Sequence, residues 1–210
     1  MEGYLTIPST VIADQVIDKS RFFAHVTKVV SSEEVEKHMR DVREKYPNAR
    51  HYVYAYRLQE GRLERASDDG EPQGTGGRPV LDLLQHRNLW DVQIIVVRYF
   101  GGILLGTGGL TRAYGGTARL AVDSIEPTML VPNALYKLEI PYSWYEQIKY
   151  QFHKKKWEIE NEQFQEKVSL NLYIPEENIK NFEIWVNEFA NMQIAWKKEK
   201  MLLRPSKGAS

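Results

Sequence analysis

The spacing of apolar residues in the first part of the chain predicts several strands. Apolar and polar side chains alternate well enough for strands over residues 4–17, 22–30 and 51–58. A polar hairpin around Glu60-Gly61 follows the third of these segments. Residues 92–97 form an apolar run, which is expected of a central, fully buried strand.

Three helices are expected between these strands. Ser31 and Glu34 have the spacing of a capping box, and the helix that they start buries a stripe containing Val35 and Val42. Pro79 opens a short helix over residues 79–85. The third helix, over residues 110–122, turns Tyr114 inward. We therefore expect an α+β unit with its helices on one face of the sheet.

The second part of the chain shows a simpler order. Strands are predicted at 134–141, 157–162, 167–174 and 192–203, and helices at 143–155 and from Pro175 onward, with an apolar stripe that reaches Phe189. The order βαββαβ is that of the ferredoxin-like split βαβ arrangement. This arrangement serves many functions, so it does not indicate one by itself.

A shift in composition separates the two parts near residue 130. Of the 14 glycines, all but Gly208 precede this point, whereas most lysines follow it. Proline-containing turn signals lie at residues 126–128 and 131–133. We therefore expect a first domain at 1–130, a second domain at 134–204, and a disordered tail at 205–210.

Charge and cysteine content exclude several classes of site. The 28 basic and 28 acidic residues cancel, so any basic surface must be local. The absence of cysteine excludes disulfides, thiol nucleophiles and cysteine-ligated metals. The first residues lack the pattern of a signal peptide, and no apolar run approaches the roughly 18 residues of a membrane span. We expect a soluble, cytoplasmic protein that does not act on membranes.

The segment from Arg98 to Arg112 is the main candidate for binding. It carries five glycines between an apolar run and a helix, and the glycines are Gly101, Gly102, Gly106, Gly108 and Gly109. One interpretation is an anion or nucleic-acid contact, because N–H groups at a helix start attract negative charge. The other is tight packing of helix on sheet, with solvated arginines. The segment matches neither a Walker loop nor a dinucleotide-binding fingerprint.

An acidic segment precedes the second predicted helix. Asp68, Asp69 and Glu71 lie within four residues, with Thr75 close behind. Three carboxylates can hold Mg²⁺, but EF-hand spacing is missing and Asp-Gly and Glu-Pro are ordinary turn pairs. We favour a structural loop that covers the glycine-rich site, and we expect no metal, no cofactor and no catalytic residue.

Aromatic and basic residues suggest a further surface. Tyr52, Tyr54 and Tyr56 share one face of a strand, where they would either stack bases or form core. Lys19 and Arg21 add positive charge to the same region.

These segments as a set closely resemble the IMPACT (YigZ-type) family. The resemblance covers about residues 1–130 and rests on Lys19-Ser20-Arg21-Phe22, Tyr54-Ala55-Tyr56, residues 67–75 and residues 98–114. It implies a first domain of the ribosomal protein S5 domain 2-like fold. It also implies a ferredoxin-like second domain similar to the C-terminal domain of elongation factor G.

The resemblance also implies a role in translation. Eukaryotic members act in translational control by binding an activator of a stress-responsive kinase. The leading hypothesis is a translation regulator that binds RNA or the ribosome through the glycine-rich surface, with Lys19, Arg21, Tyr54, Tyr56, Arg98, Tyr99 and Arg112 joining the five glycines. One alternative is a protein-interaction adaptor. The other is a binder or enzyme for a phosphorylated small molecule or nucleotide, for which the acidic segment supplies the only candidate groups.

Overall fold

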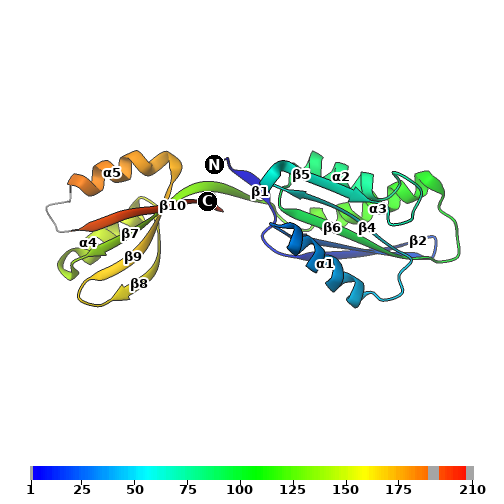
Figure 1. Cartoon of the computed structure of the whole chain (residues 1–210), viewed down its shortest axis with the longest axis horizontal. Helices are drawn as coiled ribbons and strands as arrows, with labels where there is room; N and C mark the ends of the chain where they lie inside the picture. Colours follow the sequence, from blue (N-terminus) through cyan, green and yellow to red (C-terminus); the bar gives the residue numbers. More distant parts are fainter. Residues whose placement is uncertain (1, 189–193, 207–210) are drawn as a thin grey trace. The chain divides into compact units, whose positions relative to one another are not determined.

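The computed structural model describes residues 2–188 and 194–206, and these form two compact units. The first unit is Tyr4–Met129, and the second is Leu130–Ser210 together with Met1–Gly3. Figure 1 shows the elements of each unit. The division falls inside one long strand, β7 (Thr128–Ile140).

The first unit is built on a five-stranded antiparallel sheet with the order β2-β3-β6-β4-β5. Its elements are β1 (Tyr4–Thr6), β2 (Val11–Ile17), β3 (Ser20–Lys28), α1 (Ser32–Lys45), β4 (His51–Leu58), a 3₁₀ turn (Glu60–Arg62), β5 (Leu63–Ser67), α2 (Gly77–His86), β6 (Val92–Tyr99) and α3 (Gly106–Asp123). The predicted central strand is confirmed, since β6 lies in the middle of the sheet and Val92 to Val97 are buried.

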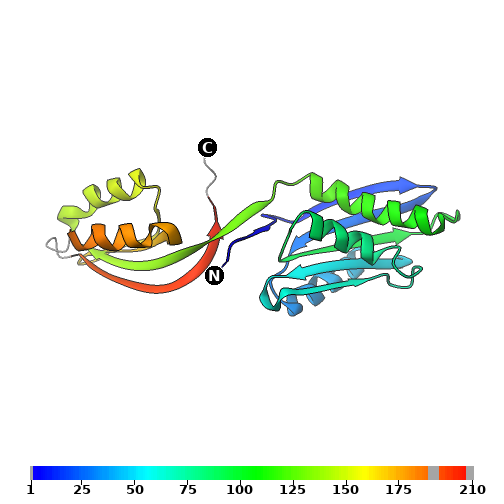
Figure 2. The same ribbon diagram turned by 90° about the horizontal axis from the view of Figure 1, so that it is seen from above.

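Helices cover both faces of this sheet, so the expectation of helices on one face is wrong here. Phe22, Ala24 and Val26 of β3 join one core with residues of α2 and α3. The alternate residue Phe23 packs with residues of α1 on the other face. Figure 2 shows α1 separated from α2 and α3 by the strands. A sheet covered twice must bury both faces of its middle strand, which explains the apolar run in β6.

Several boundaries in the first unit differ from those expected. The predicted strand at 4–17 is two strands, because the chain bends at residues 7–10 around Pro8, which has no N–H for a ladder. The hairpin expected around Glu60-Gly61 is confirmed, since β5 pairs antiparallel with β4 across it. Helix α2 begins at Gly77, two residues before the proline, and α3 begins at Gly106, four residues earlier than expected. The predicted capping box is confirmed, since Ser31 Oγ accepts a 3.3 Å hydrogen bond from the Glu34 N–H.

The second unit has the predicted βαββαβ order. After β7 come α4 (Tyr142–Lys154), β8 (Glu158–Phe164), β9 (Val168–Pro175), a 3₁₀ turn (Glu176–Asn178), α5 (Ile179–Glu188) and β10 (Ala195–Pro205). The strands lie in the order β10-β7-β9-β8, and all neighbouring pairs are antiparallel. Both helices share one core with alternate residues of β7 and β9, and Figure 2 shows them on the same side of the sheet.

Strand β7 corrects the expectation of a turn between the two parts. It begins at Thr128 and passes through Pro132, which lies opposite Leu203 of β10. Phe189, Met192 and residues 207–210 of the expected tail lie outside the described residues, while Pro205 ends β10.

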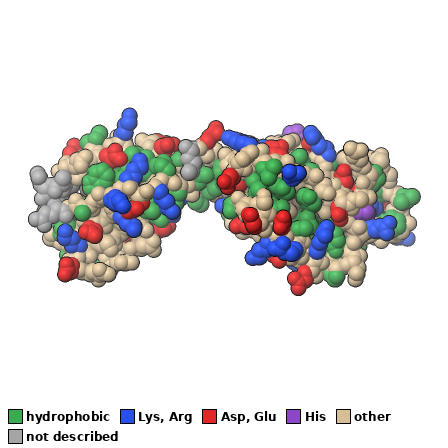
Figure 3. All heavy atoms as spheres, in the orientation of Figure 1, with side chains coloured by type: hydrophobic (Ala, Val, Ile, Leu, Met, Phe, Trp, Pro, Cys, Tyr) green, Lys and Arg blue, Asp and Glu red, His purple; other side chains and the backbone are tan. Residues whose placement is uncertain are grey.

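Two surface-level observations complete the fold. Within residues 2–188 and 194–206, no helix has both the length and the apolar character needed to cross a membrane. Figure 3 shows acidic and basic side chains interspersed on the visible face, in keeping with equal numbers of each.

Candidate functional site

The candidate site is the end of the first sheet at which α3 begins, which we call the glycine edge. The β2–β3 turn meets the end of β6 here, because the Gly101 N–H donates to Ser20 Oγ at 3.2 Å. The start of β4 joins it through the Arg50 N–H, which donates to the Arg98 carbonyl at 2.9 Å. The acidic segment closes over this edge through Glu71. Four segments that are distant in sequence therefore meet at one place.

A charged cluster lies buried beneath this edge. Arg98 is only 5% exposed, and its Nη1 donates to Glu71 Oε1 at 2.6 Å. The Tyr114 hydroxyl donates to the same oxygen at 2.7 Å, and Arg98 Nη2 lies 3.5 Å from Ser20 Oγ. Burial and the Glu71 carboxylate raise the pKa of the Tyr114 phenol, which keeps it a donor. The Arg98 charge is thus compensated within the protein, in contrast to the exposed phosphate contact that the sequence suggested.

Asp68 holds the start of α2. Its Oδ1 accepts hydrogen bonds from the N–H groups of Gly76 and Gly77 at 2.9 and 2.8 Å, and its Oδ2 accepts one from Gly74 at 2.8 Å. Burial raises the pKa of Asp68, but the three donors outweigh burial and lower it overall. The same hydrogen bonds stabilise the start of α2, because a carboxylate there satisfies N–H groups that have no partner within the helix.

The other acidic-segment residues have separate structural partners. Asp69 Oδ2 accepts the Tyr52 N–H at 2.7 Å, and Thr75 Oγ1 donates to the Pro72 carbonyl at 2.6 Å. Glu71 points into the buried cluster. Within the described residues, no three His, Asp or Glu side chains are arranged to hold a metal ion. The acidic segment therefore packs over the glycine edge and is fixed there by these hydrogen bonds.

The five glycines of the edge have different reasons to be glycine. A Cβ on Gly101 would lie 2.0 Å from the Lys19 carbonyl carbon, so the β2–β3 turn packs directly on its backbone. Gly102 and Gly106 have φ of +87° and +66°, which only glycine adopts without strain. A Cβ on Gly109 would meet Leu105 Cβ at 3.1 Å, whereas one on Gly108 would meet nothing closer than Arg112 Nη1 at 3.5 Å.

The first turn of α3 is open to solvent. The 18-residue helix has Leu105 as its N-cap residue, and no side chain caps it. Residues 106–108 are exposed. The free N–H groups and the positive end of the helix dipole therefore face outward at this point. Gly108 removes the side chain from the same turn without any packing reason inside the protein.

Exposed cations border this turn. Arg50 and Arg112 are exposed, and Arg112 Nη1 lies beside Gly108. Lys19 and Arg21 are exposed as well, but the Arg21 guanidinium lies over the Phe23 ring, on the face of the sheet that α1 covers. A cavity of about 490 Å³ lies next to the turn and is lined by Arg98, His51, Phe100 and Leu104, among others. Phe100 and Leu104 are 48% and 87% exposed, respectively. The edge thus combines positive charge with apolar surface.

The tyrosines do not form an open stacking face. Tyr56 is 7% exposed and belongs to a small core with Val29 and Val35, and the Tyr54 ring lies 6.3 Å from the Tyr56 ring within the same packing. Helix α1 covers this face, and the two rings lie in this packing, as in the core alternative that the sequence left open. Tyr99 is half-buried and donates to the Pro47 carbonyl at 3.0 Å.

Sequence reasoning missed several residues of the edge. Ser20 is fully buried and links Arg98 to Gly101, although it appeared only as part of a motif. Tyr114 was expected as core, and its position on the inward stripe of α3 gave no sign of its bond to Glu71. His51 Nδ1 lies 2.7 Å from the Asp69 carbonyl. Arg98 and Arg112, both expected on one nucleic-acid-binding surface, line different cavities.

The comparisons with known proteins cover both units. The model of the Impact N-terminal domain matches residues 18–122, which include the whole glycine edge, and a domain of unknown function matches residues 138–191. An IMPACT family member of Haemophilus influenzae is 37% identical over 90% of this chain and 93% of its own length. IMPACT family member YvyE of Bacillus subtilis is 31% identical over 91% and 88%. The crystal structure of a hypothetical protein aligns with a TM-score of 0.63 and 30% identity over 95% of this chain and 98% of that one.

Proposed function

This chain belongs to the IMPACT family, and we propose that it regulates translation by binding single-stranded RNA at the glycine edge. The observation that carries the proposal is the uncapped, exposed first turn of α3, with Gly108 open and Arg50 and Arg112 exposed around it. The free N–H groups of such a turn can bind one phosphate group of an RNA strand, and the arginines can bind the adjacent phosphate groups. A role in translation would place the protein in the cytoplasm.

The apolar part of the edge favours a single strand over a duplex. Phe100 and Leu104 project next to a cavity of about 490 Å³. An unpaired base can enter such a cavity and stack on an aromatic ring, whereas the bases of a duplex are already stacked on one another. Arg98 and Glu71 form the polar wall of the cavity and are held in place by Tyr114. Because Arg98 and Glu71 are paired with each other, they shape this wall and leave the ligand contacts to the exposed arginines.

We propose further that the two units adopt the folds that the family resemblance implies. The order of elements and the strand order β10-β7-β9-β8 support a ferredoxin-like second unit. For the first unit, we propose that the elements from β3 to α3 form the S5 domain 2-like fold. Neither fold specifies RNA by itself, so the proposal depends on the glycine edge.

The test is direct binding of fluorescent oligonucleotides. Single-stranded RNA, double-stranded RNA and DNA are titrated at two salt concentrations with the parent protein and with the double variant Arg50→Glu/Arg112→Glu. We expect salt-sensitive binding of single-stranded RNA that the double variant loses. Arg40→Glu is the matched control, because Arg40 is an exposed arginine of α1 on the opposite face of the sheet.

Three results would overturn the proposal. Absence of RNA binding at low salt would do so, as would equal loss in Arg40→Glu. Binding of duplex and single strand with equal affinity would show that the cavity takes no base. Stabilisation by a nucleotide alone, without RNA binding, would favour a phosphorylated small molecule as the ligand. A single protein partner that survives nuclease treatment would favour the adaptor alternative.

A further inference from the structure

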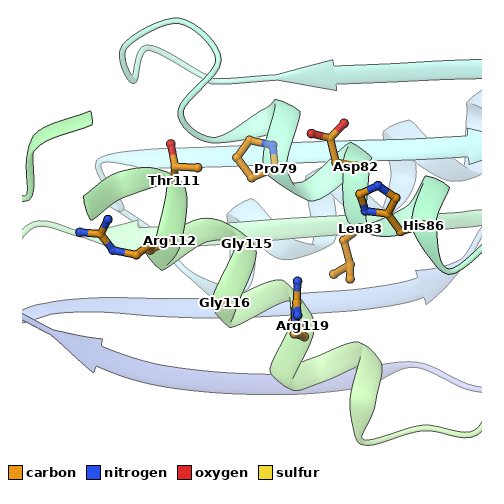
Figure 4. Close-up of a pocket in the computed structure, with 9 residues that line it drawn as sticks. All are labelled: Pro79, Asp82, Leu83, His86, Thr111, Arg112, Gly115, Gly116 and Arg119. Atoms are coloured by element: carbon orange, nitrogen blue, oxygen red, sulfur yellow. The ribbon is translucent and has the colours of Figure 1, made fainter. Parts of the chain in front are cut away.

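We propose that a second surface of the first unit, the groove between α2 and α3, binds an acidic segment of a partner protein. This surface is separate from the cavity of the glycine edge. Figure 4 shows side chains of both helices around one hollow, and its volume is about 410 Å³. The proposal rests on the shape of the groove and on the charges that border it.

The middle of the groove is apolar and lacks protruding side chains. Pro79 and Leu83 line it from α2, and Gly115 and Gly116 line it from α3. A Cβ on Gly115 would lie 3.4 Å from Pro79 Cβ, and one on Gly116 would lie 3.6 Å from Gln15 Nε2, both within ordinary contact. Glycine inside a helix is destabilising relative to alanine, so its presence there needs a reason. The packing of the unit therefore does not require these two glycines, and their effect is to keep the groove open.

Asp82 lines the groove, but the unpaired charges on its two helices have one sign. The two helices contain only two carboxylates, Asp82 and Asp123. Asp82 Oδ1 lies 2.7 Å from Arg78 Nε, and Asp123 is paired with Arg87. Both carboxylates are thus neutralised by arginines of the same unit. The remaining charges on the two helices are positive.

Arg112 and Arg119 are these remaining charges, and both line the groove. Both are exposed, and among residues 2–188 and 194–206 neither forms an ion pair. They are seven residues apart on α3, which places them about 10 Å apart along the helix axis. Acidic side chains four residues apart in an extended chain lie on one face, about 13 Å apart, with the middle residue on the same face between them. The long arginine side chains can span the difference between the two spacings.

The floor of the groove favours a peptide over a nucleic-acid strand. A phosphate backbone seeks N–H or O–H donors along its whole path. Pro79 has no N–H, and the N–H groups of Gly115 and Gly116 are engaged within α3, far from its first turn. An apolar side chain between two acidic residues would instead fill the hollow and exclude water from the flanking ion pairs. The groove thus suits an acidic peptide with an apolar residue at its centre.

The test uses two defined probes rather than an unknown partner. A fluorescent peptide Gly-Glu-Glu-Leu-Glu-Glu-Gly and its lysine counterpart are titrated with the full chain by anisotropy. The variants are Arg119→Glu, which leaves the glycine edge intact, and Arg112→Glu/Arg119→Glu. The control is Arg40→Glu on α1. Circular dichroism checks that each variant is folded, and single-stranded RNA is titrated alongside.

We expect the parent to bind the acidic peptide and not the lysine peptide. Arg119→Glu should weaken this binding at least fivefold, the double variant should prefer the lysine peptide, and Arg119→Glu should bind RNA as the parent does. Absence of acidic-peptide binding, or equal weakening in Arg40→Glu, would overturn the proposal. Loss of RNA binding in Arg119→Glu would assign the groove to the RNA path instead. Failure of RNA binding with peptide binding intact would overturn only the RNA proposal.

Discussion

The glycine edge contains arginines in two settings that have opposite consequences. Arg98 lies inside, where Glu71, Tyr114 and Ser20 surround it. Arg50 and Arg112 lie outside, next to an uncapped helix start. The inner arginine holds the acidic segment onto the sheet, while the outer ones remain available to a ligand. Burial and partner, rather than residue type, therefore decide which arginine is structural and which one is exposed to a ligand.

The largest effect should come from breaking the inner cluster. Glu71→Ala leaves the Arg98 charge buried without its partner and leaves the Tyr114 hydroxyl without an acceptor. We expect the free energy of unfolding to fall by about 3–5 kcal/mol. Urea denaturation measures this change. Arg50→Ala, on the rim, should change it by less than about 0.5 kcal/mol. Similar losses in the free energy of unfolding for Glu71→Ala and Arg50→Ala would contradict the distinction between the buried Arg98 cluster and the exposed arginines.

A second buried polar side chain, that of His25 beneath α1, should make the stability of the protein depend on pH. His25 is 4% exposed, its Nε2 has no partner among the described residues, and burial, then Lys45 and His38, lower its pKa to about 4. The unfolded chain takes up this proton near pH 6.5, whereas the folded protein resists it. Stability should therefore be unaffected by His25 above pH 6.5, and it should fall by about 3 kcal/mol as the pH drops from 6.5 to 4.

Thermal unfolding at several pH values, with His25→Phe as the comparison, isolates this histidine. Carboxylates contribute to acid sensitivity in both proteins, so the difference between the two curves is the relevant quantity. That difference should grow between pH 6.5 and 4 and then level off. Parallel curves would show that His25 does not oppose protonation in the folded state.

Gly101 tests close packing at the edge. Its Cβ would lie 2.0 Å from backbone atoms of the β2–β3 turn, which must shift to accept it. We expect Gly101→Ala to lower the free energy of unfolding by about 1–3 kcal/mol. Chemical denaturation checks the value. A stable Gly101→Ala protein would mean that the turn is not held against β6.

Gly108→Ala should give the smallest change in the free energy of unfolding, and it should raise this free energy, whereas Glu71→Ala and Gly101→Ala lower it. Gly108 lies in α3, where an added Cβ would make only an ordinary contact, at 3.5 Å from Arg112 Nη1, so Gly108→Ala should raise the free energy of unfolding by up to about 1 kcal/mol. The same variant should weaken RNA binding, because the added methyl group occupies the approach to the first turn. Increased stability with unchanged affinity would place the RNA elsewhere.

Local features were predictable from the sequence, and long-range partners were not. The capping box at Ser31 and the central position of β6 follow from neighbouring residues. The pairing of Glu71 with Arg98 joins positions 27 residues apart, and nothing in either segment indicates the other. A two-residue period correctly placed Tyr54 and Tyr56 on one face, but it cannot show that α1 covers that face. The sequence identified the glycine-rich segment as a candidate site. The structure was needed to separate the glycines that packing or backbone conformation requires from Gly108, which neither requires.

The most direct test of the account is the salt dependence of single-stranded RNA binding. The slope of log Kobs against log salt concentration counts the phosphate contacts, at about 0.7 for each one in a single strand. For Arg50→Gln/Arg112→Gln we predict a slope that is smaller than that of the parent by about 1.4, which corresponds to two lost contacts. Arg40→Gln should keep the parent slope. An unchanged slope in the double variant would contradict the claim that the outer arginines, rather than Arg98, contact the ligand.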